Sequence, residues 1–282
     1  VAPSRGLGDV YKRQILKPEL GRGEQRIADW ILNNPGGLVP LSITELAARA
    51  GCGEATIFRF AKRLGFNGYQ ELKISLAREE NENAVSENIS AGDKLTDIFH
   101  KISDDIYRSL EKTGKILSEE SLRAAAEGLI RSERVLVFGL GNSASVATDA
   151  AHKLMRIGFD AVAISDNHMQ AIAASHLGKN DAVIGISHSG SSKDVVEAMK
   201  TARDKGAFTI AVTNYGKSPI DKYSDVKLFT SADETNYSIL ALNSRIAQLA
   251  IIDTLYFYII YRMPEAKTAI EETERALLNK KY

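Results

Sequence analysis

Apolar residues in the first third of the chain recur at the i, i+3, i+4 spacing of amphipathic helices. The pattern predicts helices over 22–34, from Ser42 to about residue 50, over 54–64 and over 70–80. Ser42 and Glu45 form a capping box at the start of the second helix. Glycines at 51 and 53 predict a tight turn before the third. A short helix, a glycine turn and a slightly longer helix make up the helix-turn-helix pattern.

Residues 79–93 are polar and acidic and contain no aromatic side chain, which is typical of a linker. An amphipathic helix is predicted next, over 93–117. Its apolar face carries Leu95, Ile98, Ile102, Ile106 and Leu110. This face is expected to pack either on the second domain or on a partner chain.

The remainder of the chain alternates apolar runs with helical patterns. Strands are predicted over 134–139, 160–165, 181–186, 207–213 and 225–230. Helices are predicted over about 143–157, 167–177 and 192–205, followed by a short link over 214–224 and a long helix from about Ser238. Apolar strands joined by helical crossovers indicate a parallel sheet covered on both faces. The predicted fold class is an all-α helix-turn-helix domain followed by an α/β doubly wound domain with a five-stranded parallel sheet.

Two turns rich in serine and glycine follow the first and third predicted strands, at 139–145 and 187–192. In the doubly wound order 2-1-3-4-5 these strands are neighbours, so both turns are expected to meet in one crevice. Each turn precedes a helix, whose N-terminal N–H groups attract anions, and serine hydroxyls add hydrogen-bond donors. The pattern predicts a small phosphorylated ligand. The alternative is that Ser187, Ser189 and Ser192 only cap a helix.

The third helix of the helix-turn-helix pattern carries basic side chains on its predicted outer face. Arg59 is suited to a guanine edge, and Lys62 and Arg63 are suited to phosphates. The alternative is the solvated face of an ordinary helical bundle. The predicted DNA-binding residues are Glu54, Thr56, Arg59, Lys62, Arg63 and Asn67.

The amino-acid composition excludes several classes of protein and of binding site. The chain has 282 residues with 36 basic and 36 acidic side chains, so a generally basic nucleic-acid coat is excluded but one DNA-reading helix is not. Cys52 is the single cysteine, which excludes an internal disulfide and a cysteine metal cluster. The histidines lack zinc-ligand spacing, and we expect neither a metal nor a cofactor. The chain is expected to be cytoplasmic.

Two further segments need an interpretation. Residues 1–14 fit no downstream pattern and are interpreted as a leader foreign to the protein or a disordered tail. Residues 246–261 form the longest apolar stretch, which three polar side chains interrupt, and it is too short to span a bilayer comfortably. We interpret this stretch as a buried helix or a subunit interface and expect no membrane association.

Several motifs resemble a known family when they are taken together. The turn GLGNSAS with Lys153-Leu154, the segment ISHSGSSKDVV and the later Ser244-Arg245-Ile246 resemble the SIS (sugar isomerase) domain. With ATIFRFAKRLGFNGYQELK before it, the chain resembles the RpiR family of bacterial sugar-responsive transcription regulators over about residues 15–262. The resemblance implies operator DNA, a sugar-phosphate effector and a homodimer or homotetramer.

The resemblance also implies positions for the ligand and the domains. Ser143 and the segment Ser187–Ser192 would form the phosphate and sugar site. The expected domains are a helix-turn-helix domain over 15–79, a linker and connecting helix over 80–117 and a SIS domain over 118–282. The predicted ligand-binding residues are Gly141, Asn142, Ser143, Ser187, His188, Ser189, Gly190, Ser191, Ser192 and Glu234.

Some features depart from the family pattern or leave another function open. Gly53 replaces the usual first serine of the recognition helix, and Ser192 replaces a common threonine but keeps the hydroxyl. An aldose–ketose sugar-phosphate isomerase would need Glu234 or a histidine as its base. A dinucleotide-binding protein would use the turn from Gly139 and Asp166, but it would leave the second turn unexplained.

Overall fold

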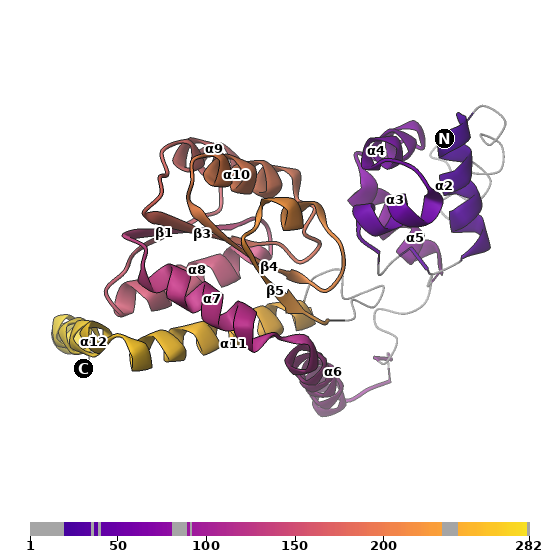
Figure 1. Cartoon of the computed structure of the whole chain (residues 1–282). Helices are drawn as coiled ribbons and strands as arrows, with labels where there is room; N and C mark the ends of the chain where they lie inside the picture. The colour runs from indigo at the N-terminus through magenta and orange to yellow at the C-terminus, as the bar shows by residue number, and fades with distance from the viewer. Residues whose placement is uncertain are drawn as a thin grey trace. The chain divides into compact units, whose positions relative to one another are not determined.

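The computed structural model of the chain describes residues 20–34, 37–38, 41–80, 89–90, 92–232 and 242–280. Two compact units are present. The helical one contains the described residues up to Lys101 together with Gly216–Ser218, and the α/β one contains the other described residues from Ile102 onward. Figure 1 draws the helices of the first in indigo to purple and most of the second in magenta to yellow.

The helical unit confirms the four helices expected from the apolar pattern. These are α2 (Arg22–Asn33), α3 (Ile43–Ala50), α4 (Glu54–Arg63) and α5 (Tyr69–Glu80). One residue from each inner face, namely Ile27, Leu46, Ile57 and Leu72, is completely buried. The capping box also forms, because the Ser42 amide donates to Glu45 Oε2 at 2.9 Å and the Glu45 amide to Ser42 Oγ at 3.2 Å. The core therefore fixes which face of α4 points outward.

The α/β unit contains the predicted five-stranded parallel sheet in the order β2-β1-β3-β4-β5. Its strands are β1 (Arg134–Gly139), β2 (Asp160–Ile164), β3 (Asp181–Ile186), β4 (Phe208–Asn214) and β5 (Val226–Thr230). The crossover helices are α8 (Ser143–Arg156), α9 (Asn167–Ser175) and α10 (Lys193–Asp204), and the link to β5 contains the short helix η2 (Pro219–Tyr223). The strand order brings the ends of β1 and β3 together.

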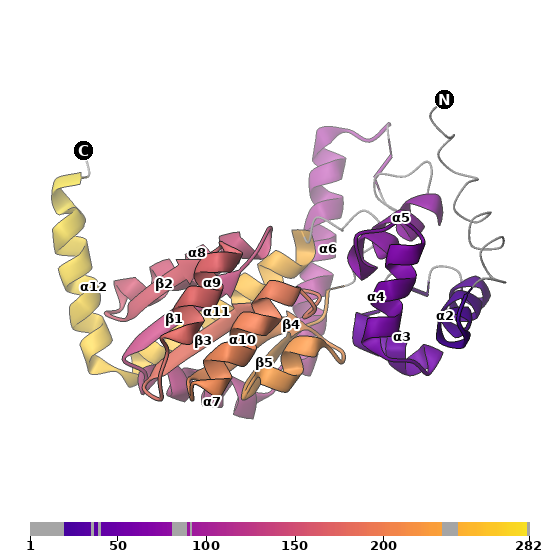
Figure 2. The same cartoon turned by 90° about the horizontal axis from the view of Figure 1, so that it is seen from above.

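Alternate strand residues build separate cores on the two faces of the sheet. Val135 and Val137 pack toward α7 (Glu119–Ile130), α8 and α11 (Leu242–Arg262). Leu136 and Phe138 pack toward α9 and α10 on the opposite face. Figures 1 and 2 show these two helical layers with the sheet between them. Burial on both faces explains why the strands are almost continuously apolar.

Two helices of this unit were not anticipated from the sequence pattern. Gly128 lies inside α7, where glycine disfavours a helix, yet a Cβ atom there would lie only 1.9 Å from Cε1 of Phe208. Close packing on β4 therefore outweighs helix propensity. At the other end, α11 ends at Arg262 and α12 (Pro264–Leu277) follows, because proline favours a new helix start.

No single helix among the described residues is long and apolar enough to cross a membrane. Only α11 and α12 taken together pass that test of length and composition, and they are bent by 107°.

The connecting helix α6 (Leu95–Ile116) matches the predicted span but packs differently from expectation. Ser109 and Thr113 are its buried residues, and Thr113 Oγ1 accepts a hydrogen bond from the Ser231 amide at 3.0 Å. Leu95, in contrast, is 86 % exposed. Small side chains let the C-terminal part of α6 approach the end of β5, while the other residues of the apolar face are half-buried, namely Ile98, Ile102, Ile106 and Leu110.

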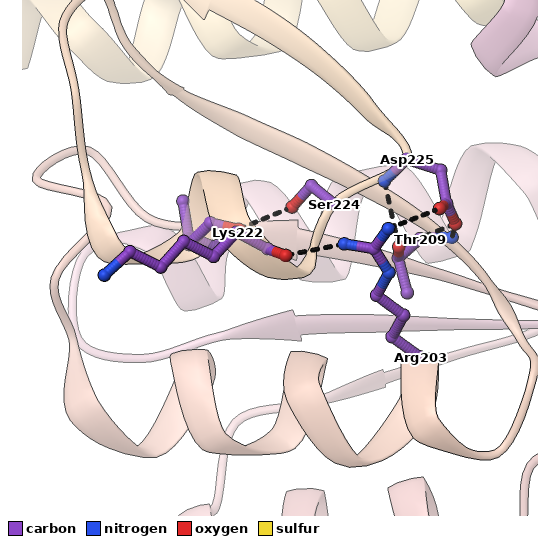
Figure 3. Close-up of polar contacts among 6 residues, drawn as sticks. Arg203, Thr209, Lys222, Ser224 and Asp225 are labelled. Atoms are coloured by element: carbon purple, nitrogen blue, oxygen red, sulfur yellow. Dashed lines mark hydrogen bonds and ion pairs between the residues drawn. The ribbon is translucent and has the colours of Figure 1, made fainter.

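A polar network joins α10, η2, β4 and β5 (Figure 3). Asp225 Oδ2 accepts hydrogen bonds from the amide and the hydroxyl of buried Thr209, both at 2.9 Å. Arg203 contacts Asp225 Oδ1 at 3.6 Å and donates to the carbonyl oxygen of Lys222. The network lies at the N-terminal ends of β4 and β5, whereas the two serine-rich turns follow the C-terminal ends of β1 and β3.

We expect Asp225→Ala to destabilise the α/β unit by about 1–3 kcal/mol, because it leaves the buried Thr209 groups without an acceptor. Thermal melting followed by circular dichroism should show the loss. Asp225→Asn, which keeps one acceptor oxygen, is the matched control. Trp30, the single tryptophan, lies in the helical unit and its fluorescence transition should not move. Equal melting of Asp225→Ala and the parent would contradict this role.

Candidate functional site

The turn between α3 and α4 has the geometry of a helix-turn-helix. Gly51 ends α3 in the left-handed conformation at φ 61°, and the Cys52 amide donates back to the Ala47 carbonyl at 2.9 Å. Behind the turn, the Tyr69 hydroxyl donates to the Leu41 carbonyl at 2.9 Å. Burial, with a smaller contribution from Glu45, raises the pKa of Tyr69, so the phenol stays a donor. The unit holds α4 rigidly.

The outer face of α4 separates the predicted DNA-binding residues into two groups. Arg59 and Lys62 are exposed, and Arg59 Nη2 contacts Thr56 Oγ1 at 3.3 Å. Arg63 Nη1, in contrast, pairs with Glu24 Oε2 at 2.7 Å, and Glu54 Oε1 accepts from Thr44 Oγ1 at 2.7 Å. Arg63 and Glu54 thus have contacts within the unit, which leaves Arg59 and Lys62 as the stronger candidates for reaching DNA.

The loop at 66–68 shows a structural contact at the predicted DNA-binding residue Asn67. The Asn67 amide donates to Glu71 Oε2 at 2.6 Å and so starts α5, while its side chain is exposed. A role for Asn67 on a phosphate stays a prediction. Two exposed residues of α4, Ala55 and Phe58, were missed. Positions 55, 58, 59 and 62 follow the i, i+3, i+4, i+7 spacing, so a helical wheel places both on the same face as Arg59 and Lys62.

The two serine-rich turns leave the sheet side by side. Gly139 and Ile186, the last residues of β1 and β3, are paired in the parallel ladder. The first turn leads into α8 and the second into α10, which lie on opposite faces of the sheet. Gly141 and Gly190 have φ values of 56° and 58°, a region that favours glycine. The predicted meeting of the turns at the switch point of the sheet is present.

The hydroxyls of the second turn face one another. Ser187 is buried and its Oγ lies 3.4 Å from Ser192 Oγ. Ser189 Oγ accepts from Ser191 Oγ at 3.0 Å and from the Ser191 amide at 3.3 Å. Although Ser192 occupies the N-cap position of α10, its hydroxyl makes no cap hydrogen bond. Capping therefore does not account for these serines.

The backbone of this turn is fixed by its neighbours. The His188 carbonyl accepts from the Asn214 amide at 3.0 Å and from Thr213 Oγ1 at 3.2 Å. The Gly190 carbonyl accepts from the Ile220 amide at 2.9 Å. These bonds occupy carbonyl oxygens of the turn and fix its backbone at the N-terminus of α10, where helix amide groups suit an anion.

The first turn is more open. Asn142 and Gly141 are exposed, Ser143 is half-buried, and the Asn142 carbonyl accepts from Ser145 Oγ at 2.8 Å. Asp166, which a dinucleotide site would use, instead caps α9 through the Met169 amide at 2.9 Å. Glu234 lies outside the described residues. No group of three potential metal-ligating His, Cys, Asp or Glu side chains occurs in the described part of the chain.

Comparisons with known proteins agree with both halves of this description. A helix-turn-helix domain model of the rpiR family matches residues 12–83, and a SIS domain model matches residues 128–258. An uncharacterized HTH-type transcriptional regulator from Caldanaerobacter subterraneus subsp. tengcongensis is 38 % identical over 240 residues, which is 84 % of each chain.

Solved structures extend the comparison. The Vibrio vulnificus NanR protein complexed with ManNAc-6P has a TM-score of 0.83 and 27 % identity, covering 97 % of this chain and 98 % of NanR. A putative sugar-phosphate isomerase from Listeria monocytogenes has a TM-score of 0.58 and 23 % identity, covering 64 % of this chain and 98 % of its own. The second likeness shows a shared fold only.

Proposed function

Since this chain belongs to the rpiR family of helix-turn-helix transcriptional regulators that carry a SIS domain, we propose that a phosphorylated sugar or amino sugar controls its binding to operator DNA. The effector binds between the turns at 141–143 and 187–192. Arg59 and Lys62 on α4 make the central DNA contacts.

One observation in particular supports this position for the ligand site. The serine at the N-cap position of α10 turns its hydroxyl toward Ser187 and not toward the helix backbone. Hydroxyls that are not used as caps, beside a helix N-terminus and a fixed glycine turn, are suited to phosphate oxygens. Positions 187–192 contain no lysine or arginine, so the turn itself offers hydroxyl and amide donors to a phosphate.

Ligand binding is tested by thermal shift with a panel of sugar phosphates. Because NanR is complexed with ManNAc-6P, that compound leads the panel, followed by hexose, pentose and muramic-type phosphates. The proposal expects one member to raise the melting temperature, while the same sugar without phosphate and NAD(H) do not. A shift with NAD(H) alone would favour the dinucleotide-binding alternative.

The effector acts here as a signal and is not converted. A regulator needs a ligand that binds two conformations unequally, and a coupling of roughly 1–3 kcal/mol between sites is typical. The chain between the sites runs through residues 80–117, and α6 is its described helical part. Effector binding changes the geometry of this segment.

The working form is a homodimer or homotetramer formed through α11. Ile246, Phe257 and Tyr261 are 36 %, 58 % and 80 % exposed and lie on one face of that helix. An exposed apolar face of this kind indicates a protein interface, and dimeric helix-turn-helix proteins read two-fold operators.

We expect Phe257→Glu to weaken self-association at least about tenfold, because it buries an unpaired charge in the interface. Light scattering over a dilution series measures the change. Ile172→Glu, at an exposed position of α9 on the other face of the sheet, is the matched control. A parent chain that is monomeric at micromolar concentration would overturn the interface.

A further inference from the structure

Phe58 is the one large apolar side chain on the outer face of α4. It is 47 % exposed, whereas Ile57 and Phe60 on either side of it in the sequence are completely buried. The exposed residues Ala55, Phe58, Arg59 and Lys62 follow the i, i+3, i+4, i+7 spacing of one helical face. An apolar pair, Ala55 and Phe58, thus lies beside the candidate base-reading arginine.

The ring of Phe58 is held in place although it is not part of the core. A Cβ atom on Gly68 would lie 3.4 Å from Phe58 Cε2, so the ring rests against that glycine. The ammonium group of Lys62 lies 5.7 Å from the ring centroid, within the range of a cation–π contact. These two contacts leave about half of a preoriented aromatic surface open.

The chemistry of the DNA major groove identifies what covers this surface. Base edges there present hydrogen-bonding groups, with one apolar exception, the C5-methyl group of thymine, which phenylalanine contacts in known complexes. The N-terminal half of a recognition helix, where Ala55 and Phe58 lie, is the part that approaches base edges. We propose that Phe58 is a specificity-determining residue that reads a thymine methyl group in each operator half-site.

This inference rests on the proposed DNA-binding function, and the experiment separates the two. Binding sites are first selected from random duplex DNA with the full chain. Each thymine of the best site is then replaced by deoxyuridine, which removes the methyl group and keeps every hydrogen bond. Affinities are measured by fluorescence anisotropy at one fixed salt concentration.

The expected result is a loss of about fourfold per half-site at one thymine position. That factor corresponds to about 0.8 kcal/mol, the contribution of one buried methylene-sized group. In Phe58→Ala the same replacement should have no effect, and the selected sites should lose their preference at that position. Phe58→Leu, which keeps an apolar contact, should retain part of the methyl effect.

Two controls exclude a general effect of removing an exposed phenylalanine and an effect of misfolding. Phe99→Ala removes another exposed phenylalanine, at 67 % exposure on α6, and should keep the full methyl effect. The replacement of thymine in the parent complex needs no variant and is therefore independent of folding.

Two negative outcomes have different meanings. If the parent selects a defined site but no thymine-to-deoxyuridine replacement changes its affinity, the role of Phe58 is wrong and the proposed function stands. If the parent selects no site at all, the proposed function itself fails, and the role of Phe58 fails with it.

Discussion

Arg59→Ala is expected to weaken operator binding by roughly 5- to 150-fold, the effect of losing one base contact that contributes about 1–3 kcal/mol. Arg59 is exposed on the outer face of α4, and its Nη2 contacts Thr56 Oγ1 of the same helix at 3.3 Å. The measurement is an anisotropy titration of the selected operator at fixed salt. Effector binding, followed by thermal shift, should be unchanged.

Arg63→Ala provides the matched control. This arginine is one position beyond Lys62 on the same helix, but it pairs with Glu24 on α2 at 2.7 Å. Its removal should reduce sequence-specific binding much less than the removal of Arg59. Equal operator affinity for Arg59→Ala and the parent would refute the assignment of α4 as the recognition helix.

The double variant Ser187→Ala, Ser189→Ala is expected to weaken effector binding more than about a hundredfold, since hydrogen bonds to a charged group contribute about 1.5–3 kcal/mol each. The contacts of both hydroxyls stay within the turn, with Ser192 and Ser191, whereas the bonds that join the turn to β4 and η2 go to the backbone carbonyls of His188 and Gly190. Folding and basal DNA affinity should therefore persist. Calorimetric titration with the best compound of the panel measures the loss.

Ser175→Ala is the control for this double variant. Its hydroxyl donates to the Ile172 carbonyl at 2.7 Å near the end of α9, away from both turns. It should bind the effector as the parent does. Undiminished binding by the double variant would move the phosphate site away from the second turn.

Periodicity was enough to predict the sheet and the recognition helix. Strands β1 and β3 were expected over residues 134–139 and 181–186 and occupy those positions, because both are buried on two faces and are bounded by polar turns. Their adjacency followed from the general strand order of doubly wound sheets. The side-by-side placement of the two turns could therefore be predicted without coordinates.

Side-chain partners could not be predicted in the same way. The apolar series that begins at Leu95 on α6 suggested an inner face, but Ser109 and Thr113 are the buried residues. Arg63 on α4 pairs with Glu24 on α2, and these two residues are 39 positions apart in the sequence. Contacts between distant elements depend on how the helices cross, and the spacing within one helix carries no information about that crossing.

On the outer face of α4 the spacing was sufficient, and a residue there was overlooked for another reason. Arg59 and Lys62 were selected for their basic side chains, and the aromatic ring of Phe58, directly before Arg59 in the sequence, was given no role. The spacing alone places Phe58 on the face of Arg59 and Lys62, and the structure adds that Ile57 and Phe60 are completely buried while Phe58 is 47 % exposed. The unanticipated α7 has a different cause, because its Gly128 is required by Phe208 on a strand 80 residues later in the sequence.

A sugar phosphate bound at the turns of the α/β unit is expected to control DNA binding by α4. Operator affinity should be titrated with and without the best compound of the panel, while NMR follows the same compound for chemical conversion. The account predicts that the compound changes operator affinity by about 5- to 150-fold and remains unaltered. Unchanged operator affinity together with an isomerised sugar would contradict it and identify an enzyme instead.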